Sequence, residues 1–512
     1  MLDSSIVATS LYTIGQEFKE TQSINWVALA YSLAYLSCAV LFARISDVIG
    51  RKWAFLASYV IFIAFSLGCG FAQSLQQLIA CRALQGIGGS GLYSTTMIVF
   101  PELTPDHQKK HIASVVGLVI AVSGVLGPVL GGILTDYASW RWVFWINGPI
   151  GLVSIVIFWL TWPKEKYLPH LERRAWKEVD FLGSFLLIAA SVLIVFPFQS
   201  AGENGDTWSQ AIFIAPLILG IFCICALFAW EYYIDTRWQG KLAAAIPLVL
   251  LRNHVYSFAT LATICMGFPY MMSVYAFPIY FQVVNGKSPL QAGLMLLPML
   301  GGTAIGTTIG GAVNGKNNRM FETFVAACIL MIIGCASETT ASGTFGTDPK
   351  ILGLLTFIGF GFGMSASAST MLANIESPVR EHASAQGIIA QVRILGGSIG
   401  IAASSAILGV KKRTQLPGIV SPQQLANLAA VGPTLSPDQL GAIRRVYTDA
   451  LRVDMIVCCG VLALGIVFSL GVYRRNRLSP MEQSRKRIIE ERERKRRLAE
   501  VKADANVLVG QI

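Results

Sequence analysis

The chain has 512 residues, of which 54% are hydrophobic and 13% are charged, and its mean hydropathy is +0.58. A soluble globular protein carries about 25% charged residues, so this composition excludes a soluble domain and predicts an all-α integral membrane protein. The net charge of +11 does not indicate nucleic-acid binding, because twelve Lys and Arg residues lie in the segment 474–512, where they can face anionic lipid.

Fourteen apolar segments are candidates to cross the membrane, since a spanning helix needs about 20 mainly apolar residues. The predicted spans are 1–14, 24–43, 53–72, 78–100, 112–134, 143–162, 180–199, 211–231, 256–281, 290–313, 321–338, 351–373, 386–408 and 451–473. The first is short, because fourteen helical residues rise about 21 Å against a hydrocarbon core of about 30 Å. We therefore expect a truncated first helix, from a gene model that lacks residues upstream of Met1.

Charged linkers divide the spans into two halves and an insert. We expect an N-terminal six-helix half at 1–163, charged linkers with a two-helix insert at 164–255, and a C-terminal six-helix half at 256–473. A basic tail at 474–512 follows.

The distribution of cations predicts the topology. Lys and Arg concentrate in alternate loops and in the tail, so the positive-inside rule predicts that both termini face the cytoplasm. The segment 409–452 is expected to be a long loop on the opposite side. This segment goes against the positive-inside rule, because it carries the cations Lys411, Lys412 and Arg413.

A charged turn separates the second and third spans. Asp47, Arg51 and Lys52 flank Gly50, and such charges cannot lie in hydrocarbon without partners, so the turn lies at a membrane surface. Two interpretations stay open from composition alone: an ion-pair latch between helix ends, and a plain solvated loop.

Two charged side chains fall inside or beside apolar spans of the first half. Arg82 lies in the fourth span, where a guanidinium costs about 3 kcal/mol, so it faces a cavity or a partner, or else it extends to the nearby surface. Gln85 follows on the same helical face. Asp3 is either buried and able to exchange protons, or a polar residue at the chain start.

Small residues mark the fifth span. These are Gly124, Gly127, Pro128, Gly131 and Gly132. Glycines at this spacing let helix backbones approach closely, and proline loosens a helix. Two compatible roles follow: tight helix packing, and a hinge or seal that moves.

Further polar residues lie in other spans. Gln391 and Arg393 occupy the span 386–408, and Arg393 lies deeper than Arg82, so we expect it to face a cavity. Asn147 and the aromatic residues of 256–281 line an apolar substrate cavity in one interpretation, whereas a helix–helix core explains most of the aromatics equally well.

No cofactor or metal is expected. His107 and His111 share helical spacing, but no third ligand is near. No Walker loop occurs, which argues against direct use of ATP. An enzyme would need His, Asp or Ser groups converging at one membrane depth, and the sequence does not present them, so we do not expect an enzyme.

Taken together, the segments resemble the fourteen-helix drug:proton antiporters of the major facilitator superfamily, especially fungal multidrug and toxin exporters. The similarity extends over 1–473 and is strongest in 1–151. It rests on Leu2–Tyr12, on Asp47, Gly50, Arg51 and Lys52, on Arg82, Gln85 and Gly86, on Gly127, Pro128, Gly131 and Gly132, and on Trp140–Asn147. The departures are Tyr12 for Pro, Ala43 for Gly, Val48 for a basic residue, and Asn314 for the acid of the counterpart loop.

The resemblance implies a secondary exporter that exchanges a small amphipathic molecule, such as a drug or fungal metabolite, for protons by alternating access. It implies that Asp47 and Arg51 latch the inner face. As proton-coupling and transport residues we expect Asp3, Arg82, Gln85, Asn147, Gln391 and Arg393.

The partners implied are a small-molecule substrate, protons and membrane lipids, with no nucleic acid. We expect a monomer in the plasma membrane or the vacuolar membrane. Two alternatives stay open: a transporter of amino acids or siderophores with the same fold, and a non-transporting membrane sensor.

Overall fold

The structure, a computed structural model, confirms an all-helical membrane fold. It describes residues 2–20, 23–103, 109–163, 175–203, 209–238, 242, 244–316, 318–340, 349–378, 381–417, 419, 436–474, 482 and 489. Every secondary-structure element in these ranges is a helix. Most of the predicted basic tail, 474–512, and much of the linker that follows the first six spans lie outside the described residues.

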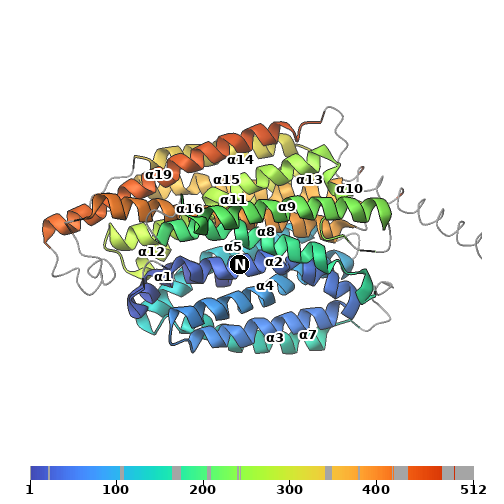
Figure 1. Ribbon diagram of the computed structural model, residues 1–512, viewed down its shortest axis with the longest axis horizontal. Coiled ribbons are helices and arrows are strands. Elements are labelled where there is room, and N and C mark those ends of the chain that lie inside the picture. The colour runs from blue at the N-terminus through green and yellow to red at the C-terminus, as the bar shows by residue number, and fades with distance from the viewer. Residues whose placement is uncertain are drawn as a thin grey trace, which may run out of the picture.

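The helices form two groups with a pair between them (Figure 1). The first group is α1 (Leu2–Phe18), α2 (Asn25–Ile49), α3 (Arg51–Gly70), α4 (Leu75–Leu103), α5 (Lys109–Tyr137), α6 (Trp142–Trp145) and α7 (Asn147–Thr161). The intervening elements are the short turn η2 (Trp176–Glu178), α8 (Phe181–Glu203) and α9 (Ala211–Arg237). The second group is α10 (Leu248–Leu251), α11 (His254–Val283), α12 (Pro289–Met295), α13 (Leu297–Lys316), α14 (Met320–Glu338), α15 (Pro349–Glu376), α16 (His382–Gln415) and α19 (Pro437–Leu470).

Each of the fourteen predicted spans coincides with helix. Eleven helical stretches of the described chain are long and apolar enough to cross a membrane, counting α6 with α7 and α12 with α13 as one each. The other three predicted spans are α1, α4 and α5. Large apolar side chains such as Val156 and Leu160 on α7, and Phe222 on α9, are exposed. Surfaces of this kind are stable when lipid rather than water surrounds them.

The helix α8 contacts both groups. It packs against α2 of the first group and α16 of the second, and α9 packs on α8. The rings of Trp26 on α2 and Phe196 on α8 lie 5.8 Å apart. In Figure 1 the pair α8 and α9 lies between the lower helices α3, α4 and α7 and the upper helices α14, α15 and α19. The insert therefore covers a seam where the two groups meet.

The prediction of a long loop at 409–452 is wrong. The helix α16 continues to Gln415, so Lys412 and Arg413 lie in its last turn, where cations interact favourably with the helix dipole. The helix α19 begins at Pro437, and Ser436 and Gln439 form a capping box that fixes this start. Apolar composition marks only the part of a helix inside lipid, so both helices extend beyond the predicted spans.

A buried carboxylate fixes the start of the insert. Asp180 is 2% exposed and caps α8 by accepting a hydrogen bond from the backbone N–H of Gly183 at 2.8 Å. Its side chain also accepts from Trp230 Nε1 of α9 at 2.9 Å and from the N–H of Ala245 at 3.3 Å. One side chain thus joins α8, α9 and the segment that leads to the second group.

Replacing Asp180 is expected to destabilise the protein, because Asp180→Ala removes a helix cap and leaves three N–H donors without their acceptor. The free energy of unfolding should fall by about 2 kcal/mol or more. Thermal melting of the purified protein in detergent measures the effect, and Lys177→Ala, at an exposed position of η2, is the control. Equal melting temperatures for the two variants would contradict this account.

Candidate functional site

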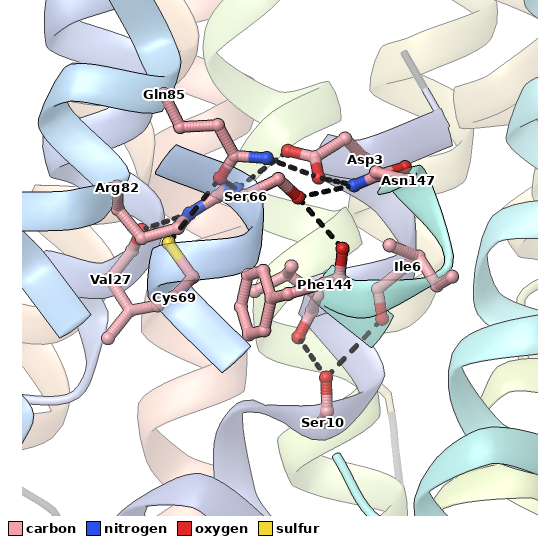
Figure 2. A network of polar contacts seen from close by, with 11 residues as sticks. Asp3, Ile6, Ser10, Val27, Ser66, Cys69, Arg82, Gln85, Phe144 and Asn147 are labelled. Carbon is pink, nitrogen blue, oxygen red and sulfur yellow. Dashed lines mark hydrogen bonds and ion pairs between the residues drawn. The ribbon is translucent and has the colours of Figure 1, made fainter. Parts of the chain in front are cut away.

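A buried ion pair lies at the centre of the first group (Figure 2). Arg82 Nη1 of α4 lies 2.6 Å from Asp3 Oδ2 of α1. Arg82 is 0% exposed and Asp3 is 6% exposed. The interpretation of Arg82 as extending to the membrane surface is therefore wrong, and Asp3 is a buried side chain.

Two amides complete the shell around the Asp3 carboxylate. Gln85 accepts a hydrogen bond from Arg82 Nη1 at 2.8 Å and donates from Nε2 to Asp3 Oδ1 at 3.0 Å. Asn147, at the first position of α7, donates to the same Oδ1 at 3.0 Å and to Ser66 Oγ at 2.9 Å. Ser66 in turn donates to the carbonyl oxygen of Phe144 at 2.9 Å. Oδ1 thus receives amide donors, whereas Oδ2 receives the guanidinium.

The guanidinium of Arg82 is held from several sides. Its Nε donates to the carbonyl oxygen of Val27 at 3.2 Å, and its charge lies 4.1 Å from the ring centroid of Tyr31, a favourable cation–π distance. Its Nη2 is buried without a hydrogen-bond partner. The cation is therefore neutralised and stacked, but among the described residues the two N–H donors of its Nη2 have no acceptor.

The sequence interpretation placed Asn147 in an apolar cavity with aromatic residues, and the structure places it differently. Its amide lies in the polar network of Asp3 because α7 begins beside α1 and α3. Asp3, Arg82, Gln85 and Asn147 are thus brought together, whereas Gln391 and Arg393 lie on α16 in the other group.

The charged turn between α2 and α3 forms an ion pair. Arg51 Nη1 lies 2.5 Å from Asp47 Oδ1. Gly50 has φ 93°, in the region that favours glycine, and joins the two helices. Lys52 lies with its ammonium 4.1 Å from the ring centroid of Trp159. The interpretation of these residues as a plain solvated loop is therefore wrong.

A second arginine extends this ion pair to the other group of helices. Arg44 Nη1 lies 4.0 Å from Asp47 Oδ2, and Arg44 Nη2 lies 3.7 Å from Glu381 Oε2, directly before α16. The same Nη2 donates to the carbonyl oxygen of Ala244 at 2.7 Å. The sequence did not predict the ion pair between Arg44 and Glu381. The available signal was that Arg44 and Asp47 are three residues apart and share a helix face.

The glycines of α5 permit backbone contact on two sides. A methyl group added to Gly127 would lie 1.9 Å from Ser5 Oγ, and one added to Gly131 would lie 2.3 Å from the carbonyl oxygen of Ile6, both on α1. A methyl group on Gly132 would lie 2.4 Å from Leu290 Cα of α12. The helix α5 therefore joins α1 to the second group.

Pro128 takes part in the same contact, and Gly124 lies in the same helix. A methyl group added to Gly293 of α12 would lie 2.4 Å from the carbonyl oxygen of Pro128. At the end of α5, Asp136 accepts hydrogen bonds from Ser288 Oγ at 2.9 Å and from the N–H of Leu290 at 3.1 Å. Backbone packing and a capping contact thus join the two groups here.

In the second group, Arg393 is buried beside α15. Its Nη2 donates to Ser369 Oγ at 2.7 Å and to the carbonyl oxygen of Ala366 at 3.4 Å. Gln391 is also buried. Among the residues that the structure describes, no group of three or more His, Cys, Asp or Glu side chains is arranged to hold a metal ion.

Comparison with known proteins identifies the family. Residues 1–401 match the Major Facilitator Superfamily. The chain belongs to this superfamily. It is therefore a multi-pass membrane transporter and not an enzyme, and a transporter of this superfamily takes a small-molecule substrate.

Two relatives are named as transporters or resistance proteins. The MFS-type transporter FPY5 of Fusarium mangiferae is 30% identical over 469 residues, which cover 89% of this chain and 78% of that protein. Multidrug resistance protein 3 of Bacillus subtilis is 30% identical over 403 residues, which cover 78% of this chain and 75% of that protein.

A solved structure shares the fold of the transporter. A bacterial homologue of the human lysosomal transporter Spinster, in an inward-facing and unoccupied conformation, matches with a TM-score of 0.60 at 15% identity. The match covers 92% of this chain and 93% of the other. It confirms the major facilitator fold.

Enlarging Gly132 is expected to disturb the contact between α5 and α12. Gly132→Ala places a methyl group inside the van der Waals radius of the Leu290 backbone, so the helices must separate, at a cost of about 1–3 kcal/mol. Equilibrium unfolding in mixed micelles measures the loss. The matched control is Gly311→Ala on α13, where an added methyl group meets nothing within 4 Å. A stability loss as large in the control would contradict the prediction.

The pair between Arg44 and Glu381 is expected to show energetic coupling. In a double-mutant cycle with Arg44→Gln and Glu381→Gln, the coupling energy should reach about 1 kcal/mol or more, since both side chains are largely buried. The comparison cycle uses Arg252 and Asp235, which are 2.8 Å apart with Arg252 64% exposed. There the coupling should stay below about 0.5 kcal/mol. Additive effects at Arg44 and Glu381 would refute the link.

Proposed function

We propose that the transporter is a proton-coupled exporter of small amphipathic molecules, of the fourteen-helix drug:proton antiporter type. The observation that carries the proposal is the carboxylate of Asp3, which is buried at membrane depth and held by Arg82, Gln85 and Asn147. Intramembrane ionisable groups are costly and often belong to proton pathways. The name of one relative, multidrug resistance protein 3, supports efflux as the direction, since removing a drug from the cell confers resistance.

The geometry supports a specific coupling step. Asp3 Oδ1 already accepts two amide donors, so an incoming proton binds at Oδ2, where it competes with Arg82 Nη1 at 2.6 Å. Protonation removes the charge that neutralises Arg82 and releases the guanidinium. Since α1 carries Asp3 and α4 carries Arg82, the step changes how these two helices attract each other.

Alternating access then follows from the contacts between the halves. We propose that residues 1–163 rock against 256–473, with 164–255 as the insert and 474–512 as a basic tail near anionic lipid. The ion pairs of Asp47 would close the inner end, and the glycine contacts of α5 would help to seal the other end. The protein would act as a monomer in the plasma or vacuolar membrane.

The first experiment measures export of a fluorescent amphipathic dye from cells that express the chain, with and without an uncoupler. Export should stop when the proton gradient collapses. Arg82→Ala should abolish export, because it leaves Asp3 buried without its cation, a change that costs about 3–5 kcal/mol. Asp3→Asn should abolish proton-driven export, while exchange of labelled for unlabelled dye persists.

The control is Arg237→Ala, which removes an exposed cation on α9. It should export dye like the unaltered chain, and surface expression is measured for every variant. Export that ignores the uncoupler would refute proton coupling. Proton-driven export by a well-expressed Asp3→Asn variant would remove Asp3 from the mechanism.

A further inference from the structure

The two buried arginines of the bundle differ in how their charges are balanced. Arg82 has a carboxylate partner at 2.6 Å and an aromatic ring at 4.1 Å. Arg393 is 9% exposed, and its contacts among the described residues are the neutral oxygens of Ser369 and Ala366. Its Nε is buried without a hydrogen-bond partner. One cation is neutralised, and the other is not.

The buried carboxylates of the neighbouring helices make their contacts with other residues. Glu376 of α15 accepts a hydrogen bond from Asn253 Nδ2 at 2.8 Å and lies 3.4 Å from Arg474 Nη1. Asp454 of α19 accepts a hydrogen bond from Ser404 Oγ at 2.6 Å, and Ser404 lies 11 residues beyond Arg393, about 16 Å along α16. In the other direction, Glu381 precedes Arg393 by 12 residues and lies near Arg44. A buried guanidinium without a counter-charge is expensive, so its retention calls for an anion, and in the part of the chain that the structure describes the side chain contacts only neutral oxygens.

The surroundings of Arg393 add further donors from the opposite half. Helix α16 packs against both α2 and α4, which carry Tyr35 and Tyr93 with ring centroids 5.9 Å apart, and both rings are close enough to interact electrostatically with the guanidinium. Neither hydroxyl makes a hydrogen bond to another residue in the described part of the chain. A cation and two free hydroxyl groups therefore gather at one place.

This place lies on the seam between the halves. The helices α2 and α16 meet on one side of it where Asn25 Nδ2 donates to Ser405 Oγ at 2.5 Å, and on the other side where Val40 lies beside Gly387. Arg393 lies between these contacts and 7 residues into the predicted span 386–408, about 10 Å along the helix and thus inside a hydrocarbon core of about 30 Å. Substrate sites of alternating-access transporters lie inside the membrane at the seam between the halves.

We propose that Arg393, with the hydroxyl groups of Tyr35 and Tyr93, binds the anionic group of the substrate, and that the transporter therefore prefers organic acids over organic cations. The inference rests on the proposed export function and specifies its substrate class. A guanidinium binds a carboxylate through two parallel hydrogen bonds. Export of an anion and entry of a proton each make the cell interior more positive. An inside-negative membrane potential therefore drives both movements.

Two xanthene dyes of similar shape and opposite charge test the proposal: carboxyfluorescein, an anion, and a rhodamine ester, a cation. Binding of each dye to the purified full chain is measured by the shift in melting temperature, and transport is measured in proteoliposomes. We expect carboxyfluorescein to stabilise the protein and to be transported faster than the rhodamine. Arg393→Gln should weaken its binding about tenfold or more, and Tyr35→Phe about fivefold.

Arg393→Lys keeps the charge but loses the planar fork, so it should bind the anion with intermediate affinity. This variant guards against loss of binding through misfolding. Arg452→Gln on α19, at a side chain 45% exposed, should bind both dyes unchanged. Tighter binding of the rhodamine than of carboxyfluorescein, or equal losses for both dyes in a folded Arg393→Gln variant, would overturn the proposal.

The binding and transport measurements separate the two proposals. Anion binding that depends on Arg393, without proton-driven transport, would refute the proposed export function and leave the anion site standing. Proton-driven transport of both dyes at rates that do not depend on Arg393 would support export and refute the anion site.

Discussion

The ion pair between Arg82 and Asp3 is the constraint on which the first half of the transporter depends. Neither charge is tolerable at this depth alone, so the chain must bring α1 and α4 together and must supply further donors around the carboxylate. Gln85 and Asn147 meet that need and add α7 to the same contact. The position of α1 follows from this pair together with the close approach of α5, which its glycines permit.

The two ends of the contact between the halves differ in kind. At α5 and α12 the contact is made by backbone atoms, and no side-chain movement can relieve it. At Arg44, Asp47 and Glu381 it is made by charged side chains at 3.7–4.0 Å, which can change partners by side-chain rotation although they are largely buried. The ion-paired end is therefore the one at which the contact can rearrange without a shift of the backbone.

Charge balance distinguishes the two halves at membrane depth. In the first half Asp3 neutralises Arg82, so the pair carries no net charge. In the second half Arg393 remains a cation beside neutral oxygens. The counterpart of the charged turn lacks the acid there: Asn314 donates to the carbonyl oxygen of Gly310 and to Thr323 Oγ1, while Lys316 and Arg319 keep the turn basic. The two groups of helices thus differ in how their buried charges are balanced.

The sequence by itself determined the membrane class and the positions of the helical segments, and it offered Asp47 and Arg51 as one of two interpretations, a local ion pair. Hydropathy depends on composition within about 20 residues, and two residues four apart on a helix are neighbours in any fold that keeps the helix. The sequence did not predict where α16 and α19 end, because the polar extensions of these helices carry no apolar signal. Only the tertiary structure decided that Asp3 meets Arg82, that Asn147 joins them, that Arg44 reaches Glu381, and that Arg393 lacks a counter-charge. The contacts join residues 79 to 337 positions apart, and the lack of a counter-charge at Arg393 depends on which side chains do not come near it. Only the packing of the helices decides both.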